Sequence, residues 1–239
     1  MTSSESSETS ETKDPPKDPP KFWIDTGIGG SNYRWIGGFA AITYAPFSGG
    51  MDESGPRFRI DSGYGGFYYF QNQFGPVGQA PSSIVDGRYF SVTSLVGYAY
   101  VSDGLSASGF IGANYQYSGL SVNDTSNPTS GARGGVAVSG DVDYRPIKSW
   151  SIMGIGAFST ANNTWFSILG VGYEVSPDVY LGPEVATSGN EFSRRLSAGA
   201  RLRGIKVGPA ILSFAGGFQY DTKIGNGGYG ALQLSAPIQ

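Results

Sequence analysis

The feature that most constrains this chain is an alternation of apolar and polar residues with a period of two. One face of the run Leu105–Tyr117 carries Leu105, Ala107, Gly109, Ile111, Ala113, Tyr115 and Tyr117. The other face carries Ser106, Ser108, Phe110, Gly112, Asn114 and Gln116. Successive side chains of a β-strand point to opposite faces, so the run predicts a strand. Its length is near the roughly 9–11 residues with which a tilted strand crosses a bilayer.

The same alternation recurs along the chain and predicts about twelve strands. The expected strands are Phe22–Gly29, Trp35–Tyr44, Arg57–Phe70, Tyr89–Tyr100, Leu105–Tyr117, Gly135–Arg145, Trp150–Ser159, Trp165–Val175, Val179–Thr187, Phe192–Leu202, Ala210–Tyr220 and Tyr229–Ala236. We therefore expect an all-β protein, a closed antiparallel transmembrane β-barrel over residues 22–239.

The lengths of the connections give a second test of this architecture. If both termini are periplasmic, the two longest links, Gln71–Gly87 and Ser118–Gly134, fall on the outer side, as bacterial barrels prefer. Short turns such as Ser176–Asp178 fall on the periplasmic side. The long link Ala45–Pro56 is also periplasmic and departs from the pattern.

Composition excludes several classes of function. The chain has no Cys and no His, which removes thiolate metal sites and the Ser-His-Asp triad. We expect neither a metal nor a cofactor, and no enzymatic activity. A net charge of −3 without a basic stripe argues against a nucleic-acid partner.

Residues 1–21 form a separate segment rich in Ser, Glu and Pro, which ends in two KDPP units. Such a segment buries too little apolar surface to offset the entropy of ordering, so it predicts a disordered tail. It lacks the charged, apolar and small-residue regions of a signal peptide. Export to an outer membrane would therefore need a signal that is not present in this chain.

A soluble β-sandwich or a lipocalin-like ligand-binding barrel in the periplasm would show the same alternation. The two classes differ in which face is polar. In this chain the aliphatic and aromatic faces carry almost no charge, with Arg194 as the exception near a strand end. That distribution favours lipid on the outside, and it predicts the bacterial outer membrane as the location and its lipid as a partner.

The faces opposite the apolar ones collect charged residues that we expect to line the lumen. These are Asp25, Arg57, Arg59, Asp61, Asp141, Asp143, Arg145, Glu174, Glu184, Arg195, Arg201 and Arg203. Six acids and six arginines can brace the barrel with salt bridges, form a selective constriction, or border a binding site at the mouth. Asp141 and Asp143 could also form a glycosidase pair, but Arg145 follows on the same face and nothing else marks a cleft.

The second half of the chain resembles the BcsS family, small outer-membrane barrels associated with bacterial cellulose biosynthesis. The most specific residues are Leu181-Gly182-Pro183-Glu184, Gly189-Asn190-Glu191 and Arg195 with Gly199. Further matches are Gly131–Gly135, Ser159-Thr160-Ala161, Gly170–Tyr173 and Gly228-Tyr229. The first half fits loosely, through Arg59 and Gly63–Tyr69.

The resemblance implies an accessory role in cellulose or exopolysaccharide biosynthesis or export, as a structural element or a narrow conduit. Its implied partners are cellulose and the synthase or export machinery. It also implies that Tyr180, Glu184, Arg195 and Arg201 are lumen neighbours, which we expect to brace the wall rather than bind sugar. A general small-solute, porin-like channel is the alternative.

Overall fold

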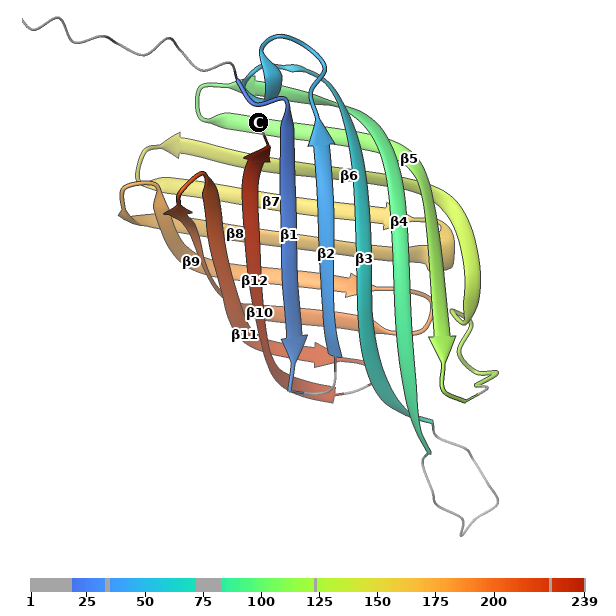
Figure 1. Ribbon diagram of the computed structural model, residues 1–239. Coiled ribbons are helices and arrows are strands. Elements are labelled where there is room, and N and C mark those ends of the chain that lie inside the picture. The colour runs from blue at the N-terminus through green and yellow to red at the C-terminus, as the bar shows by residue number, and fades with distance from the viewer. Residues whose placement is uncertain (1–18, 33–34, 72–82, 123, 224, 239) are drawn as a thin grey trace, which may run out of the picture.

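Hydrogen bonding between consecutive strands closes the chain into a ring (Figure 1). The computed structural model describes residues 19–32, 35–71, 83–122, 124–223 and 225–238. Within these residues the strands are β1 Phe22–Ser31, β2 Trp35–Tyr44, β3 Gly55–Gln71, β4 Ser83–Ser102, β5 Leu105–Leu120, β6 Gly131–Ile147, β7 Trp150–Ser159, β8 Thr164–Ser176, β9 Val179–Gly189, β10 Arg194–Val207, β11 Ala210–Asp221 and β12 Gly225–Ile238. The prediction of a closed antiparallel barrel of about twelve strands is confirmed.

The ring closes where the first strand meets the last. β1 pairs with β12 in antiparallel register from Phe22↔Ile238 to Ser31↔Tyr229, so no strand edge is left unpaired. Both strand ends that lead to the termini therefore lie at one end of the barrel, which we call the terminus end (Figure 1). The opposite end is called the loop end.

Most turns at the terminus end are tight. Two residues each separate β4 from β5, β6 from β7, β8 from β9 and β10 from β11. Gly104 and Asp178 adopt the left-handed conformation that such turns require, with φ of 73° and 63°. Short turns at the end that carries the termini are the arrangement of bacterial membrane barrels.

The exception at the terminus end is the link between β2 and β3, which contains the short 3-10 helix η1, Gly50–Asp52. This link packs against the segment that leads into β1. The Ala45 amide donates to the Lys21 carbonyl (2.8 Å), and the Met51 amide donates to the Pro20 carbonyl (2.9 Å). Residues 1–18 of the predicted tail lie outside the described residues.

The wall is uneven at the loop end. β3, β4, β5 and β6 have 16 to 20 residues, whereas β1, β2 and β7 have 10. The β3–β4 pair runs past its neighbours in Figure 1. The expected link Gln71–Gly87 is therefore wrong in extent, because β4 already begins at Ser83 and pairs with the end of β3. Residues 72–82 lie outside the described residues.

The outward face is apolar and exposed around the ring. Its middle carries aliphatic and aromatic side chains such as Ile111, Val138, Leu169, Val185 and Leu232. Rings cluster near the strand ends at the terminus end: Phe22 stacks on Tyr44 (4.6 Å between centroids), and Trp150 packs edge-on against Tyr173 (5.4 Å). An exposed apolar band between aromatic girdles is the outer surface of a transmembrane barrel.

No helix within the described residues is long and apolar enough to span a membrane.

The apolar band predicts that the free-energy cost of a charged side chain depends on its depth in the membrane. Val138 lies in the middle of β6, whereas Ile147 is exposed at its terminus end. We expect Val138→Arg to lower the free energy of unfolding by about 2–4 kcal/mol and Ile147→Arg by about 0–1 kcal/mol. Urea unfolding of the barrel in lipid vesicles, followed by tryptophan fluorescence, measures both. Equal costs at the two positions would contradict a membrane-spanning band.

Candidate functional site: the barrel lumen

The strand registers place eleven of the twelve charged residues singled out from the sequence on the inward face. The twelfth, Arg145, lies at the register shift of β6, and its side chain contacts the inward Asp143. Residues of this face reach one another across the lumen, as the ion pair between Arg203 on β10 and Asp143 on β6 demonstrates (2.8 Å). Three strands, β7, β8 and β9, separate these two along the wall. The charges do not form one centre; they divide into several clusters at different heights.

The first cluster surrounds Arg59 on β3. Its Nε donates to Asp61 Oδ1 (2.6 Å), and its Nη1 lies 3.7 Å from Asp141 Oδ1 on β6. Asp141 also accepts from Ser108 Oγ (2.6 Å). On the neighbouring wall, Asp25 accepts from Ser235 Oγ (2.5 Å). One guanidinium thus links a carboxylate of its own strand, β3, to a carboxylate on β6.

The second cluster lies closer to the terminus end, around Asp143. This carboxylate binds Arg203 at one oxygen and has Arg145 Nε 3.5 Å from the other. Both guanidiniums also lie over the ring of Tyr180, at 5.4 and 5.5 Å from its centroid. The Tyr180 hydroxyl donates to the Lys148 carbonyl (3.2 Å), which ties this cluster to the β6–β7 turn.

The third cluster is the buried pair of Glu184 on β9 and Arg201 on β10. Arg201 Nη1 also donates to Gln233 Oε1 (3.3 Å), and Tyr229 Oη lies 3.5 Å from Glu184 Oε1. Because both charged groups are almost fully buried, each needs the charge of the other to offset the loss of its own hydration.

Arg195 is not part of this cluster, and the expectation that it neighbours Glu184 is wrong. It lies nearer the loop end of β10, where its Nη2 is 3.4 Å from Asp221 Oδ2. Its guanidinium stacks on Trp35 of β2 at 4.7 Å from a ring centroid. The predicted strand ends at Tyr220 and so does not include Asp221, which follows Gln219 on the inward face.

Arg57 and Glu174 brace the terminus end rather than the middle of the lumen. Arg57 donates to the carbonyls of Glu53 (2.5 Å), Pro56 (3.1 Å) and Met51 (3.5 Å), and so holds the β2–β3 link in place. Glu174 accepts from the amide of Asp178 in the β8–β9 turn (3.1 Å). Asp178 itself is exposed, and its hydrogen bond to Lys206 lowers the pKa of its carboxyl.

A polar cluster that we call the cap spans the loop end, and the sequence did not reveal it. Tyr69 on β3 donates to Asp124 Oδ2 in the β5–β6 loop (2.6 Å) and accepts from Asn127 Nδ2 (3.2 Å). Its ring packs edge-on against Phe192 in the β9–β10 loop, 4.9 Å away. Lys223 of the β11–β12 link lies over the same Phe192 ring (4.4 Å). Since β3 and β9 stand on opposite walls, this contact spans the mouth.

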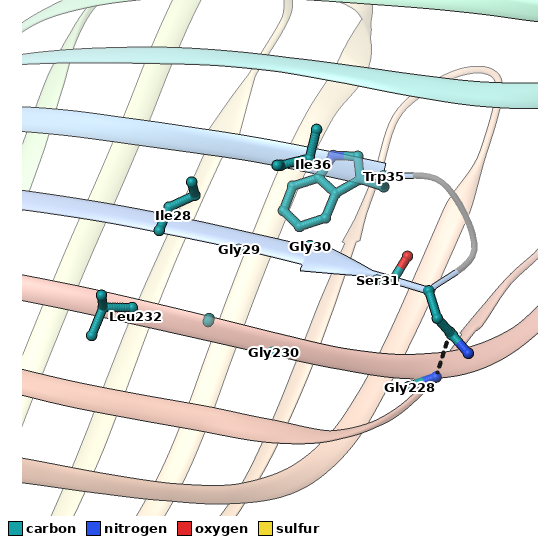
Figure 2. Close-up of a pocket in the computed structure, with 11 residues that line it drawn as sticks. Ile28, Gly29, Gly30, Ser31, Trp35, Ile36, Gly228, Gly230 and Leu232 are labelled. Carbon is teal, nitrogen blue, oxygen red and sulfur yellow. Dashed lines mark hydrogen bonds between the residues drawn. The ribbon is translucent and has the colours of Figure 1, made fainter.

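A hollow of about 510 Å³ lies at the loop-end half of β1, β2 and β12. Figure 2 shows Ile28, Ile36 and Leu232 around a stretch where the strands carry glycine. Gly30 pairs with Gly230, so the outer wall has no side chains there. The hollow is therefore a depression in the apolar outer surface.

The acidic side chains of the lumen are spread among the clusters described above. Among the described residues, no group of three or more acidic, His or Cys side chains could hold a metal ion. The acids of the lumen are instead held by arginines, as at Asp61, Asp143 and Glu184. The arrangement can brace the walls and present polar groups.

A closed barrel with an apolar outer belt and a lumen crossed by ion pairs defines a transmembrane β-barrel protein of the outer-membrane type. A family model described as cellulose biosynthesis protein BcsS matches residues 33–238. The chain belongs to the BcsS family, as expected from Leu181–Glu184 and the residues that follow. The match also runs through the first half, where the resemblance was loose.

Solved structures with a similar fold are outer-membrane barrels of very different sequence. The KdgM porin has 7% identity and a TM-score of 0.46, over 91% of this chain and 99% of that one. A Pseudomonas aeruginosa FadL homologue has 10% identity and a TM-score of 0.43, over 92% and 76%. OmpT of Vibrio cholerae has 7% identity and a TM-score of 0.35, over 90% and 96%. No curated protein matches the sequence.

The buried pair predicts a large difference between two acidic substitutions. Glu184→Ala leaves Arg201 buried with an uncompensated charge, and we expect it to lower the free energy of unfolding by about 3–5 kcal/mol. Asp178→Asn removes one partner of an exposed pair and should have no measurable effect. Denaturant unfolding in vesicles compares the two. If Glu184→Ala lowered the free energy of unfolding no more than Asp178→Asn does, the pair would not brace the wall.

Proposed function

We propose that this chain is a non-enzymatic outer-membrane accessory of cellulose biosynthesis that acts as a braced, closed barrel rather than an open channel. The single observation that carries the proposal is the ion pair of Arg203 with Asp143, which crosses the lumen between walls three strands apart. An open pore keeps its charges apart along the walls, whereas here they meet.

Two further observations support closure. The Arg59 cluster joins β3 to β6 at another height, so the lumen is crossed more than once. The cap of Tyr69, Asp124 and Phe192 then seals the loop end with buried groups whose hydrogen bonds are satisfied. Polar groups buried in this way hold one arrangement, because opening would leave them unpartnered.

Location and role rest on separate arguments. The exposed apolar belt suits only lipid, and closed barrels of this kind cross the bacterial outer membrane. Membership of a cellulose biosynthesis family points to the polymer and to the proteins that make or export it as partners.

Conductance in planar bilayers tests closure directly. We expect the wild-type barrel to pass no steady current, because ion pairs cross the lumen and the cap blocks its loop end. The double variant Tyr69→Ala/Phe192→Ala removes both sides of the contact across the mouth and should produce resolvable current steps. Tyr117→Ala, a ring removed from the outer face, is the matched control and should stay silent. Steady wild-type conductance would establish a channel instead.

The accessory role is tested in cells that produce cellulose. Deleting the gene should reduce cellulose at the cell surface, and the wild-type, non-conducting barrel should restore it. The Tyr69→Ala/Phe192→Ala variant should restore no more than the wild type does. If only conducting variants restored the polymer, the barrel would be a conduit. If deletion had no effect on cellulose, the accessory role would be wrong.

A further inference from the structure

Two phenylalanine rings face the lumen and yet remain exposed. Phe39 on β2 is 44% exposed and Phe166 on β8 is 41% exposed, while Phe110, also inward, is only 7% exposed. The Phe39 ring lies where a side chain on Gly27 would be, on the same face as Asp25. Phe166 pairs with Ala157 and Ser188, on the same face as Glu184. β2 and β8 stand on opposite walls.

The registers place both rings at one level, between two charged clusters. On β2, Phe39 lies between Trp35, which contacts Arg195, and Ala41, which pairs with Asp25 and Asp61. Next to β8, Ser188 pairs with both Phe166 and Arg195. On β1, β3, β7 and β9 to β12 the inward positions around this level are small: Gly27, Gly63, Ala157, Ala186, Gly199, Gly217 and Ala231. On β4, β5 and β6, by contrast, Leu95, Phe110 and Ala137 pack together. Solvent therefore reaches both rings inside the lumen, and we call the space around them the chamber.

The chamber opens toward the terminus end. The charged side chains on that side are well exposed, with Arg145 at 47%, Asp141 at 38% and Asp143 at 34%. On the loop-end side, Asp221 is 2% exposed and Tyr69 is 5% exposed. Solvent therefore reaches the chamber from the terminus end and is stopped at the cap.

The chemistry of the chamber selects a neutral, hydroxyl-rich guest. The bordering charges Arg59, Glu184 and Arg195 are already held in ion pairs, so a charged ligand would gain no free partner. The negative face of an aromatic ring attracts the C–H groups of a sugar. A β-1,4-linked glucan is a flat ribbon with C–H groups on both faces and hydroxyls along both edges, which suits rings on opposite walls.

We propose that the lumen is a blind-ended cup, open at the terminus end, that binds a segment of neutral β-linked glucan between Phe39 and Phe166. The site deepens the accessory role proposed above and rests on it. With the terminus end in the periplasm, the cup would hold the polymer on the side from which it arrives.

The test is binding of cellohexaose to the full-length barrel in detergent, measured by isothermal titration calorimetry. We expect Phe39→Ala and Phe166→Ala each to weaken binding about tenfold, the loss that follows when one stacking ring is removed. Phe166→Tyr keeps a ring and should keep binding. Phe158→Ala is the matched control, because this ring is also 41% exposed but lies on the outer face, and it should bind as the wild type does.

Each outcome decides the proposal. A wild-type barrel that does not bind cellohexaose overturns the site, as does equal weakening by Phe158→Ala. Equal binding of maltohexaose overturns the assignment of the β-linkage. A gel shift between unheated and boiled samples verifies that each variant is folded. If Phe166→Ala does not fold, Phe166→Leu replaces it, because leucine keeps an apolar side chain without the ring. The wild-type barrel could fail to bind cellohexaose, pass no current and still be required for cellulose at the cell surface. That combination would overturn the site and leave the accessory role standing.

Discussion

The structure depends on one constraint: backbone N–H and C=O groups inside a bilayer need partners within the protein itself. The register of β1 with β12 meets this requirement, because it supplies the last set of inter-strand hydrogen bonds and removes both sheet edges. Once the ring is closed, every strand has one face toward lipid and one toward the lumen. The alternation of the sequence, the apolar belt and the inward charges all follow from that division.

Closure also creates the second problem that the chain solves, which is how to fill the inside of a ring this wide. A soluble barrel would fill its interior with apolar side chains, but in this chain most of the large apolar side chains lie on the outer face. Arginine is well suited to the remaining task, since its long stem and planar guanidinium can span the lumen and hold two carboxylates. Arg59 does so with Asp61 and Asp141, and the Arg203–Asp143 pair joins more distant walls. The level of Phe39 and Phe166, where side chains are small, is the part left unfilled.

Much of the fold was predictable because it depends on local periodicity. All twelve strands were placed near their observed positions, and the inward set around Arg59, Asp141 and Glu184 follows from odd and even positions alone. The extension of β4 back to Ser83 was not predictable, because residues beyond the bilayer are under no pressure to keep one face apolar. The cap was missed for a related reason. Asp124 and Asn127 read as ordinary turn residues until Tyr69 is brought to them from β3.

The sequence by itself determined that this chain forms strands, that one face of each is apolar, and which charges share the other face. It could do so because a strand's two faces are set by the covalent geometry of the backbone. Only the tertiary structure decided which acid meets which arginine, since partners such as Asp143 and Arg203 are 60 residues apart and meet through the curvature and stagger of the ring. For the same reason it separated Arg195 from Glu184, although both belong to the same short motif, and placed them at different heights in the lumen.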